Sequence, residues 1–283
     1  MNPFLKTLTA AALISSIHLS AAQAGSFYLA PNNFTYAVSA AQPANTLTLN
    51  GTLFKNDSGT TFDSWKFKIL GTGSFTVDVA AYESSQSSST AAGYFTNDIN
   101  GDGELTWLDA DTYFYKDTGN PIDASDAIFR CDDVENNCGG ATGANNYFNG
   151  LTPATSPLSR LTHLQSEASV DGSIHFRRDP WYDVTVNTAG DYMFLIADFR
   201  LDPAEAVAGI NVNDSFSAPS SFVNPILDHA DYKVTLSSAN MLFSINGDTI
   251  TVSQVPVPGA VWLFGTVIAG IAGFVRRKSS LSA

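Results

Sequence analysis

Cysteine, histidine and positive charge are all scarce in this 283-residue sequence. It has two cysteines, four histidines and 14 Lys and Arg residues against 27 Asp and Glu residues, so the formal net charge is −13. An acidic chain repels nucleic acid and anionic membrane surfaces, which argues against a nucleic-acid-binding function. The acidity suits divalent cations, although solubility alone is an equally good reason for it.

The sequence also lacks the usual signatures of catalysis. His163, His175 and His229 are widely spaced and do not show metal-ligand spacing, and His18 lies in the N-terminal segment. No Gly-x-Ser-x-Gly motif occurs, so a serine hydrolase has no local signature. A pair of glycosidase carboxylates stays open as an alternative, because their separation is spatial. We expect a protein without catalytic residues.

The N-terminus has the pattern of an export signal. Lys6 gives a short positive region, residues 8–19 are mostly apolar and small, and Ala22-Gln23-Ala24 fits the small-x-small cleavage pattern. We predict a signal peptide over residues 1–24, export through the Sec translocon, and cleavage between Ala24 and Gly25. A buried N-terminal helix is the alternative.

The C-terminus, residues 254–283, combines three features. Val255-Pro256-Val257-Pro258 predicts a stiff, extended segment, because two prolines restrict the backbone and lack N–H donors. Residues 259–275 carry no charge, and a run of this length is at the short limit for a transmembrane helix. The basic cluster Arg276, Arg277 and Lys278 closes the run and favours the cytoplasmic side.

This tail resembles the sorting signal of the PEP-CTERM family, whose members end in a Pro-rich motif, a short transmembrane helix and an Arg-rich cluster. Val-Pro-x-Pro is followed here by Trp-Leu-Phe-Gly at 262–265 and then by the basic cluster. Val257 replaces the glutamate that names the family, so the choice of processing enzyme stays open. The resemblance implies recognition by an exosortase and a host that secretes exopolysaccharide. It also implies a transient stay in the inner membrane before delivery to the cell surface or biofilm. A simple membrane anchor is the alternative.

Residues 25–253 contain short runs in which apolar and polar side chains alternate, rich in β-branched and aromatic residues. This pattern is typical of half-buried strands. We expect strands at 34–39, 46–54, 74–79, 181–186, 192–199, 232–236 and 241–245. Asn246-Gly247 predicts a hairpin, and residues 203–208 allow a single helical turn. Many short strands usually pack sheet on sheet, so we predict one all-β, jelly-roll-like β-sandwich with long loops. A division near residue 90 is the alternative.

The second half of this body resembles bacterial pre-peptidase C-terminal-type β-sandwich domains. The resembling stretches are 108–119, Asp132-Asp133 and 179–197, which share an order of strand, acidic loop, strand, Ala-Gly-x-Tyr turn and strand. The resemblance implies a non-catalytic accessory or adhesive module.

A candidate calcium loop lies between residues 97 and 109. Counting Asp98 as position 1 gives the EF-hand ligand offsets, with Asn100 at 3, Asp102 at 5, Gly103 at 6 and Asp109 at 12. This spacing brings alternate oxygens onto one hard cation, while Gly103 supplies the bend and Glu104 offers its backbone carbonyl. The loop resembles that of dockerins, although residues 110–115 predict a strand rather than a helix. We predict a structural Ca²⁺; a metal-free turn is the alternative.

Two further features lie after this loop. Asp123, Asp126, Asp132, Asp133 and Glu135 form an acidic group in the sequence that either adds calcium ligands or is a solvated loop. Cys131 and Cys138 are close enough in the chain for a small-loop disulfide, which an oxidising compartment favours. A metal site needs more cysteine or histidine nearby than the sequence provides.

Three functions from different classes fit these observations. We expect an exported cell-surface or extracellular-matrix structural protein associated with exopolysaccharide. The first alternative is a carbohydrate-binding or adhesive module, with Tyr94, Phe95, Trp107 and Tyr147 as aromatic candidates and core packing as their other reading. The second alternative is a secreted hydrolase with unrecognised carboxylates.

Overall fold

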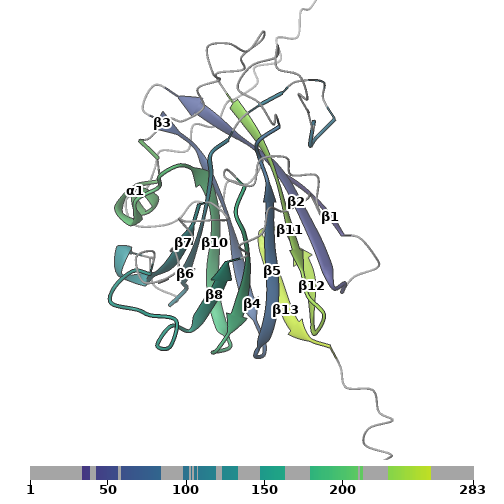
Figure 1. Cartoon of the computed structure of the whole chain (residues 1–283), viewed down its shortest axis with the longest axis vertical. Helices are drawn as coiled ribbons and strands as arrows, with labels where there is room; N and C mark the ends of the chain where they lie inside the picture. The colour runs from purple at the N-terminus through teal and green to yellow at the C-terminus, as the bar shows by residue number, and fades with distance from the viewer. Residues whose placement is uncertain are drawn as a thin grey trace, which may run out of the picture.

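The fold was analysed in a computed structural model of the chain. It describes residues 34–38, 43–56, 59–83, 98–101, 103, 105–106, 108–118, 123–132, 147–162, 179–209, 211–212 and 229–255. Within these residues the chain is almost entirely β, and two sheets pack face to face (Figure 1). The predicted all-β sandwich is therefore confirmed.

The first sheet, which we call sheet A, has seven strands among the described residues. Its strand order is β1-β2-β11-β5-β9-β8, and β3 pairs with β2 beside this path. The strands are β1 (Phe34–Val38), β2 (Thr46–Asn56), β3 (Gly59–Thr60), β5 (Gly73–Ala80), β8 (Leu158–Thr162), β9 (Trp181–Val186) and β11 (His229–Ser237).

The second sheet, sheet B, has six described strands in the order β12-β13-β4-β10-β6-β7. They are β4 (Phe62–Ile69), β6 (Ala110–Lys116), β7 (Ala127–Cys131), β10 (Gly190–Asp198), β12 (Met241–Asn246) and β13 (Thr249–Gln254). Pairing is antiparallel except between β13 and β4, which run parallel. Two short helices, η1 (Ala124–Asp126) and α1 (Pro203–Ala208), lie outside the sheets.

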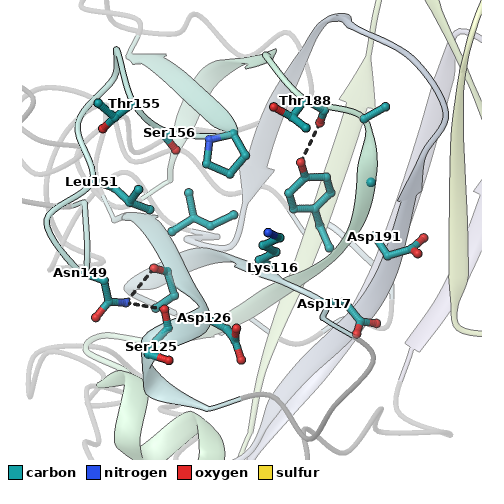
Figure 2. A pocket seen from close by; sticks show the side chains of 16 residues that line it. Lys116, Asp117, Ser125, Asp126, Asn149, Leu151, Thr155, Ser156, Thr188 and Asp191 are labelled. Carbon is teal, nitrogen blue, oxygen red and sulfur yellow. Dashed lines mark hydrogen bonds between the residues drawn. The ribbon is translucent and has the colours of Figure 1, made fainter.

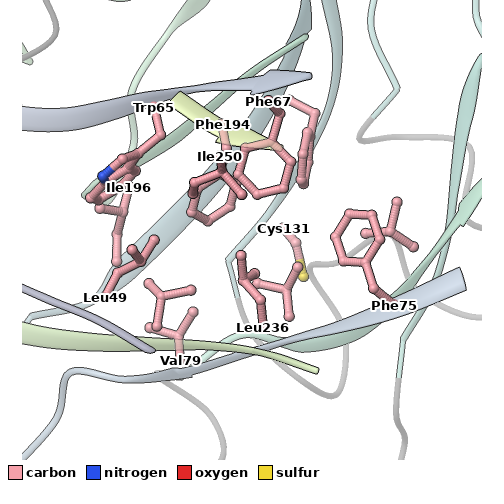
Figure 3. Packing of buried hydrophobic residues seen from close by; sticks show 14 of the residues in the cluster. Leu49, Trp65, Phe67, Phe75, Val79, Cys131, Phe194, Ile196, Leu236 and Ile250 are labelled. Carbon is pink, nitrogen blue, oxygen red and sulfur yellow. The ribbon is translucent and has the colours of Figure 1, made fainter. Parts of the chain in front are cut away.

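The core lies between the sheets and is rich in aromatic rings (Figure 3). Phe114 and Phe194 have ring centroids 5.1 Å apart, and Phe67 meets Phe114 edge to face at 5.7 Å. Such pairs are stabilising beyond their buried area. The inward residues of β4 alternate with the exposed Lys66 and Lys68, as a strand with one buried face requires.

One polar pair is buried inside this core. The hydroxyl of Tyr232 on β11 donates a 2.5 Å hydrogen bond to Asp63 on β4, which joins the two sheets. Gly51 lies directly opposite Tyr232 in β2, and a Cβ atom there would be 2.3 Å from the tyrosine oxygen. Asn50-Gly51 therefore continues a strand instead of forming a turn, because the missing side chain makes room for the ring.

Strand directions define two ends of the sandwich. The loop end holds the end of β5 and the starts of β6, β9 and β11, together with the predicted calcium loop. The pocket end holds the end of β6, the start of β7 and the β9–β10 turn. In Figure 1 the pocket end is the lower one, where the β4–β5 hairpin closes.

Candidate functional site

The predicted calcium loop is folded tightly around the side chain of Asp98. One carboxylate oxygen accepts the N–H of Gly101 at 2.5 Å, and the other accepts the N–H of Gly103 at 2.8 Å. Both glycines have positive φ, +77° and +91°, a conformation that other residues rarely adopt. The sharp bend predicted at Gly103 is therefore present.

Glu83 attaches this loop to sheet A. It follows the end of β5, is completely buried, and uses both carboxylate oxygens. One accepts the N–H of Ile99 at 2.8 Å, and the other accepts the N–H of Thr106 in a shorter bond. The backbone N–H of Asp231 in turn donates to the Thr106 hydroxyl at 2.8 Å. We call this arrangement of Glu83, Ile99, Thr106 and Asp231 the loop clamp.

Burial strongly affects acidic groups at this end and in the core. Desolvation raises the pKa of Glu83 to about 7, and the nearby charge of Asp231 adds to the shift. Burial raises the pKa of Asp63 in the core to about 7 as well, against the opposing effect of the Tyr232 hydrogen bond. On the outer face of sheet B, burial raises the pKa of Asp111 well above its usual range despite Arg130 at 3.5 Å.

The structure describes only some of the predicted calcium ligands. Asp98 and Asn100 lie in the loop, and Asp109 lies immediately before β6, where its backbone carbonyl accepts the N–H of Phe199. Asp102 and Glu104 lie outside the described residues. Within the described part of the chain, no group of three or more Asp, Glu, His or Cys side chains is arranged to hold a metal. Calcium binding therefore stays a prediction.

The acidic group predicted after this loop is divided between the two ends. Asp123 and Asp126 cap η1 at the pocket end, where the Ser125 hydroxyl and N–H lower the pKa of the exposed Asp123. Asp132 is buried beyond the far end of β7. Asp133 and Glu135 lie outside the described residues. The strand β7 thus separates residues that are neighbours in the sequence, and the described members do not form one cluster.

The remaining predicted residues lie mostly outside the described ranges. Cys131 is buried at the end of β7 and does not carry a free thiol, but Cys138 is not described, so their pairing stays a prediction. Val255 is the last described residue of the predicted sorting motif. The rest lie outside: Ala24, Gly25, Pro256, Val257, Pro258, Arg276, Arg277 and Lys278. Among the described residues no helix is long and apolar enough to cross a membrane, and the span predicted at 259–275 is not among them.

Of the four aromatic candidates for carbohydrate contact, the structure describes only Tyr147. Tyr147 is buried, its hydroxyl accepts the N–H of Arg160 at 2.9 Å, and the Arg160 guanidinium lies 5.3 Å from its ring centroid. It is a core residue, which was the other reading of this tyrosine. Tyr94, Phe95 and Trp107 lie outside the described residues.

A pocket of about 650 Å³, which the sequence did not indicate, lies at the opposite end of the sandwich (Figure 2). Four segments line it: the end of β6, η1 with the start of β7, residues 149–157, and the β9–β10 turn. Its volume is typical of small-molecule sites. No local motif could reveal it, because its lining residues are spread over residues 116–192.

The pocket walls are held by hydrogen bonds of their own. Asn149, in the left-handed conformation at φ +56°, donates its amide to the carbonyls of Ala124, Ser125 and Ala127 at 3.0–3.1 Å. On the opposite wall, the N–H groups of Asn187 and Thr188 donate to the carbonyl of Pro157. The pocket is thus preformed by bonds between segments that are distant in the sequence.

Comparison with known proteins does not place this chain in a family. No protein-family model matches the chain, and no curated protein matches it. The fold and the two ends of the sandwich are therefore the basis for a functional proposal.

Proposed function

We propose that this chain is an exported, non-catalytic structural protein of the cell surface or extracellular matrix, associated with exopolysaccharide. The loop clamp is the observation that supports the structural, non-catalytic part of the proposal. Its buried glutamate accepts two backbone N–H groups, so this acidic group holds a loop in place instead of facing a substrate. An architecture of two packed sheets with fixed loops suits a durable extracellular module.

The two chain ends support export and sorting. The signal-like segment 1–24 would direct the chain to the Sec translocon, and the PEP-CTERM-like tail 254–283 would be held in the inner membrane and processed by an exosortase. These roles rest on the sequence patterns, since both segments lie outside the described residues apart from Gln254 and Val255.

The loop end supports a structural calcium ion. The carboxylate of Asp98 accepts the N–H groups of Gly101 and Gly103, and both glycines have positive φ. An EF-hand-like loop needs a bend of this kind. Asp98, Asn100, Asp102, Asp109 and the carbonyl of Glu104 would supply the oxygens. A disulfide between Cys131 and Cys138 would close a short loop beyond β7, and an oxidising compartment would preserve it.

Cell fractionation of the full chain, carrying a tag after Gly25, tests the export proposal. We expect the tag at the cell surface or in the matrix, and retention in the inner membrane when Arg276, Arg277 and Lys278 are replaced by alanine or when the exosortase is absent. A tag that stays in the cytoplasm, or a surface signal that is independent of the tail, would contradict the proposal.

Thermal unfolding of the purified full chain in detergent tests the calcium proposal. At a tenfold excess of calcium over its Kd we expect about 1.4 kcal/mol of stabilisation, which raises Tm by roughly 3–6 °C over the chelated protein. Asp98→Asn should remove this difference, whereas the matched variant Asp248→Asn, at the β12–β13 turn, should keep it. Identical melting curves with calcium and with chelator would rule out the site.

The alternative that a specific observation favours is a carbohydrate-binding module. That observation is the preformed pocket at the end opposite the loop clamp, because binding modules present preorganised polar groups in a concave surface. A secreted hydrolase is the least supported of the three functions, because no observation on the described residues points to a catalytic pair.

A further inference from the structure

We propose that the corner of the sandwich at which β13 ends lies against the outer lipid surface of the inner membrane while the tail is held there. This corner, which we call the exit corner, consists of residues 70–73, 238–240 and 253–255. The inference rests on the membrane-held stage of the proposed function, and it adds which part of the sandwich faces the lipid. The short distance to the apolar run, the lack of charge and the exposed apolar side chains of this corner all support the orientation.

Hydrogen bonds fix the point at which the chain leaves the sandwich. The N–H of Val255 donates to the carbonyl of Asn240 at 3.1 Å, and the side-chain amide of Gln254 donates to the carbonyl of Thr72 at 2.8 Å. The end of β13 is therefore attached both to the β11–β12 turn and to the β4–β5 hairpin. In Figure 1 these strands meet at the lower end of the sandwich.

The chain between this point and the predicted membrane segment is short. Three residues, 256–258, separate Val255 from the uncharged run 259–275. In any conformation three residues span at most about 11 Å. The strand β10 has nine residues and is therefore roughly 30 Å long. An inserted tail thus keeps the exit corner close to the lipid, whereas the loop end reaches the lipid only if the sandwich lies on its side.

The exit corner has no charged residue, in a chain with 27 Asp and Glu residues. Its three segments read Leu-Gly-Thr-Gly, Ser-Ala-Asn and Ser-Gln-Val. The carboxylates of the pocket end, Asp117, Asp123, Asp126 and Asp191, lie beyond β4 from β13, on or next to β10, β6 and β7. A surface with anionic lipids repels carboxylates. The uncharged corner can therefore approach such a surface without the repulsion that the acidic parts of the body would meet.

Two of the exposed apolar side chains lie in the exit corner. Leu70 is 57% exposed at the tip of the β4–β5 hairpin, and Val255 is 42% exposed. The N–H of Leu70 donates to the carbonyl of Val252 at 2.8 Å, so the hairpin tip stays beside the start of the tail. Single exposed apolar residues are common, but these two flank the point from which an apolar run departs. At a lipid interface their side chains leave water, which stabilises this orientation.

A sideways orientation is the alternative, with the open face of sheet B on the lipid. Lys66 and Lys68 are exposed on this face, where Thr251 of β13 pairs with Lys68, and their charges favour anionic lipid. Asp191 lies opposite Lys68 on the same face and offsets part of that charge. The end-on orientation keeps this mixed face away from the lipid, so the exit corner is the better match.

The test is photo-crosslinking of the full chain in vesicles of phosphatidylethanolamine with a minority of phosphatidylglycerol. A photoreactive amino acid replaces Leu70 in one chain, Phe54 in a second and Thr251 in a third. Phe54 is the matched control, because it is an apolar side chain that is 42% exposed at the loop end. We expect lipid adducts from position 70, and from positions 54 and 251 only the background of a chain without the probe. Circular dichroism of each chain checks that the sandwich is folded.

Extraction of the same vesicles with alkaline carbonate separates the two proposals. A chain that the carbonate extracts does not have an inserted tail, which would overturn the membrane stage of the proposed function and this inference with it. A chain that resists extraction but gives no more lipid adduct at position 70 than at position 54 would overturn the orientation alone. That result is also expected if the exit corner faces a processing enzyme instead of lipid. More adduct at position 251 than at position 70 would show the sideways orientation and overturn the end-on one.

Discussion

The two ends of the sandwich use the same kind of side chain in opposite ways. At the loop end Glu83 is completely buried and holds two backbone N–H groups, and burial raises its pKa to about 7. At the pocket end Asp191 is exposed and makes no side-chain hydrogen bond with the described residues. Burial thus makes one carboxylate part of the fold and leaves the other available for binding.

This difference has an energetic consequence. A buried carboxylate must be compensated by donors, and removing it leaves those donors unsatisfied, so its loss affects stability. An exposed carboxylate is solvated in the folded and unfolded chain alike, so its loss hardly changes stability. The comparison predicts that substitutions which lower the free energy of unfolding will concentrate at the loop end. Substitutions which weaken ligand binding will concentrate at the pocket end.

The largest expected effect is a pH dependence from Asp63 in the core. Its pKa of about 7 in the folded chain exceeds the unfolded value of 3.8, so the folded state holds the proton more tightly. The stability that Asp63 contributes is fully present below about pH 4 and is lost as pH rises through 7, by on the order of 3 kcal/mol between about pH 5 and about pH 8. Urea unfolding at both pH values measures this change.

Asp63→Asn is the control for that measurement. The amide does not titrate, so the variant should lose the Asp63 contribution and keep a smaller slope of the same sign from Glu83 and Asp111, whose pKa values are also raised. A variant with the same pH slope as the wild type would show that Asp63 does not titrate in this range.

The next effect is at the loop clamp itself. Glu83→Ala leaves the N–H groups of Ile99 and Thr106 without their acceptor, and we expect a loss of about 2 kcal/mol in the free energy of unfolding. Asp191→Ala at the pocket end should change it by less than about 0.5 kcal/mol. Equal effects in urea unfolding near pH 6 would remove the distinction between the two ends.

A smaller loss of stability than at the loop clamp is expected at the pocket wall. Asn149→Ala removes three hydrogen bonds from an exposed side chain and places alanine at φ +56°, so we expect a loss of about 1 kcal/mol. Asn149→Gly keeps the backbone conformation and isolates the hydrogen bonds from the strain. If both variants are as stable as the wild type, the wall is held by other contacts.

Period-two patterns predicted much of the fold. The expected strands correspond to β1, β2, β5, β6, β9, β10, β11 and β12, and Asn246-Gly247 joins β12 to β13 as predicted. No strand was predicted at β4, although Trp65 to Ile69 alternates clearly, because Asp63 and Ser64 put polar residues at buried positions. The parallel pairing of β13 with β4 depends on contacts between distant segments, so a local pattern does not predict it.

The candidate sites were predictable to different degrees. The Asp98 and Gly103 offsets predicted a tight bend, because the ligands of such a loop are close in sequence. The partner of this loop, Glu83, lies 16 residues before Ile99 and 23 before Thr106, and nothing local connects them. The pocket combines four separate segments, so it emerges only when the strands are assembled.

Residue-resolved hydrogen exchange, in calcium and in chelator, compares the two ends most directly. We expect calcium to slow exchange of the N–H groups of Ile99, Gly101, Gly103 and Thr106, which the loop clamp and Asp98 already hold. The N–H groups of Asn187 and Thr188 at the pocket end should exchange at the same rate in both conditions. Equal exchange at the loop end with and without calcium, or equal slowing at both ends, would contradict the account of a structural loop end and an independent pocket end.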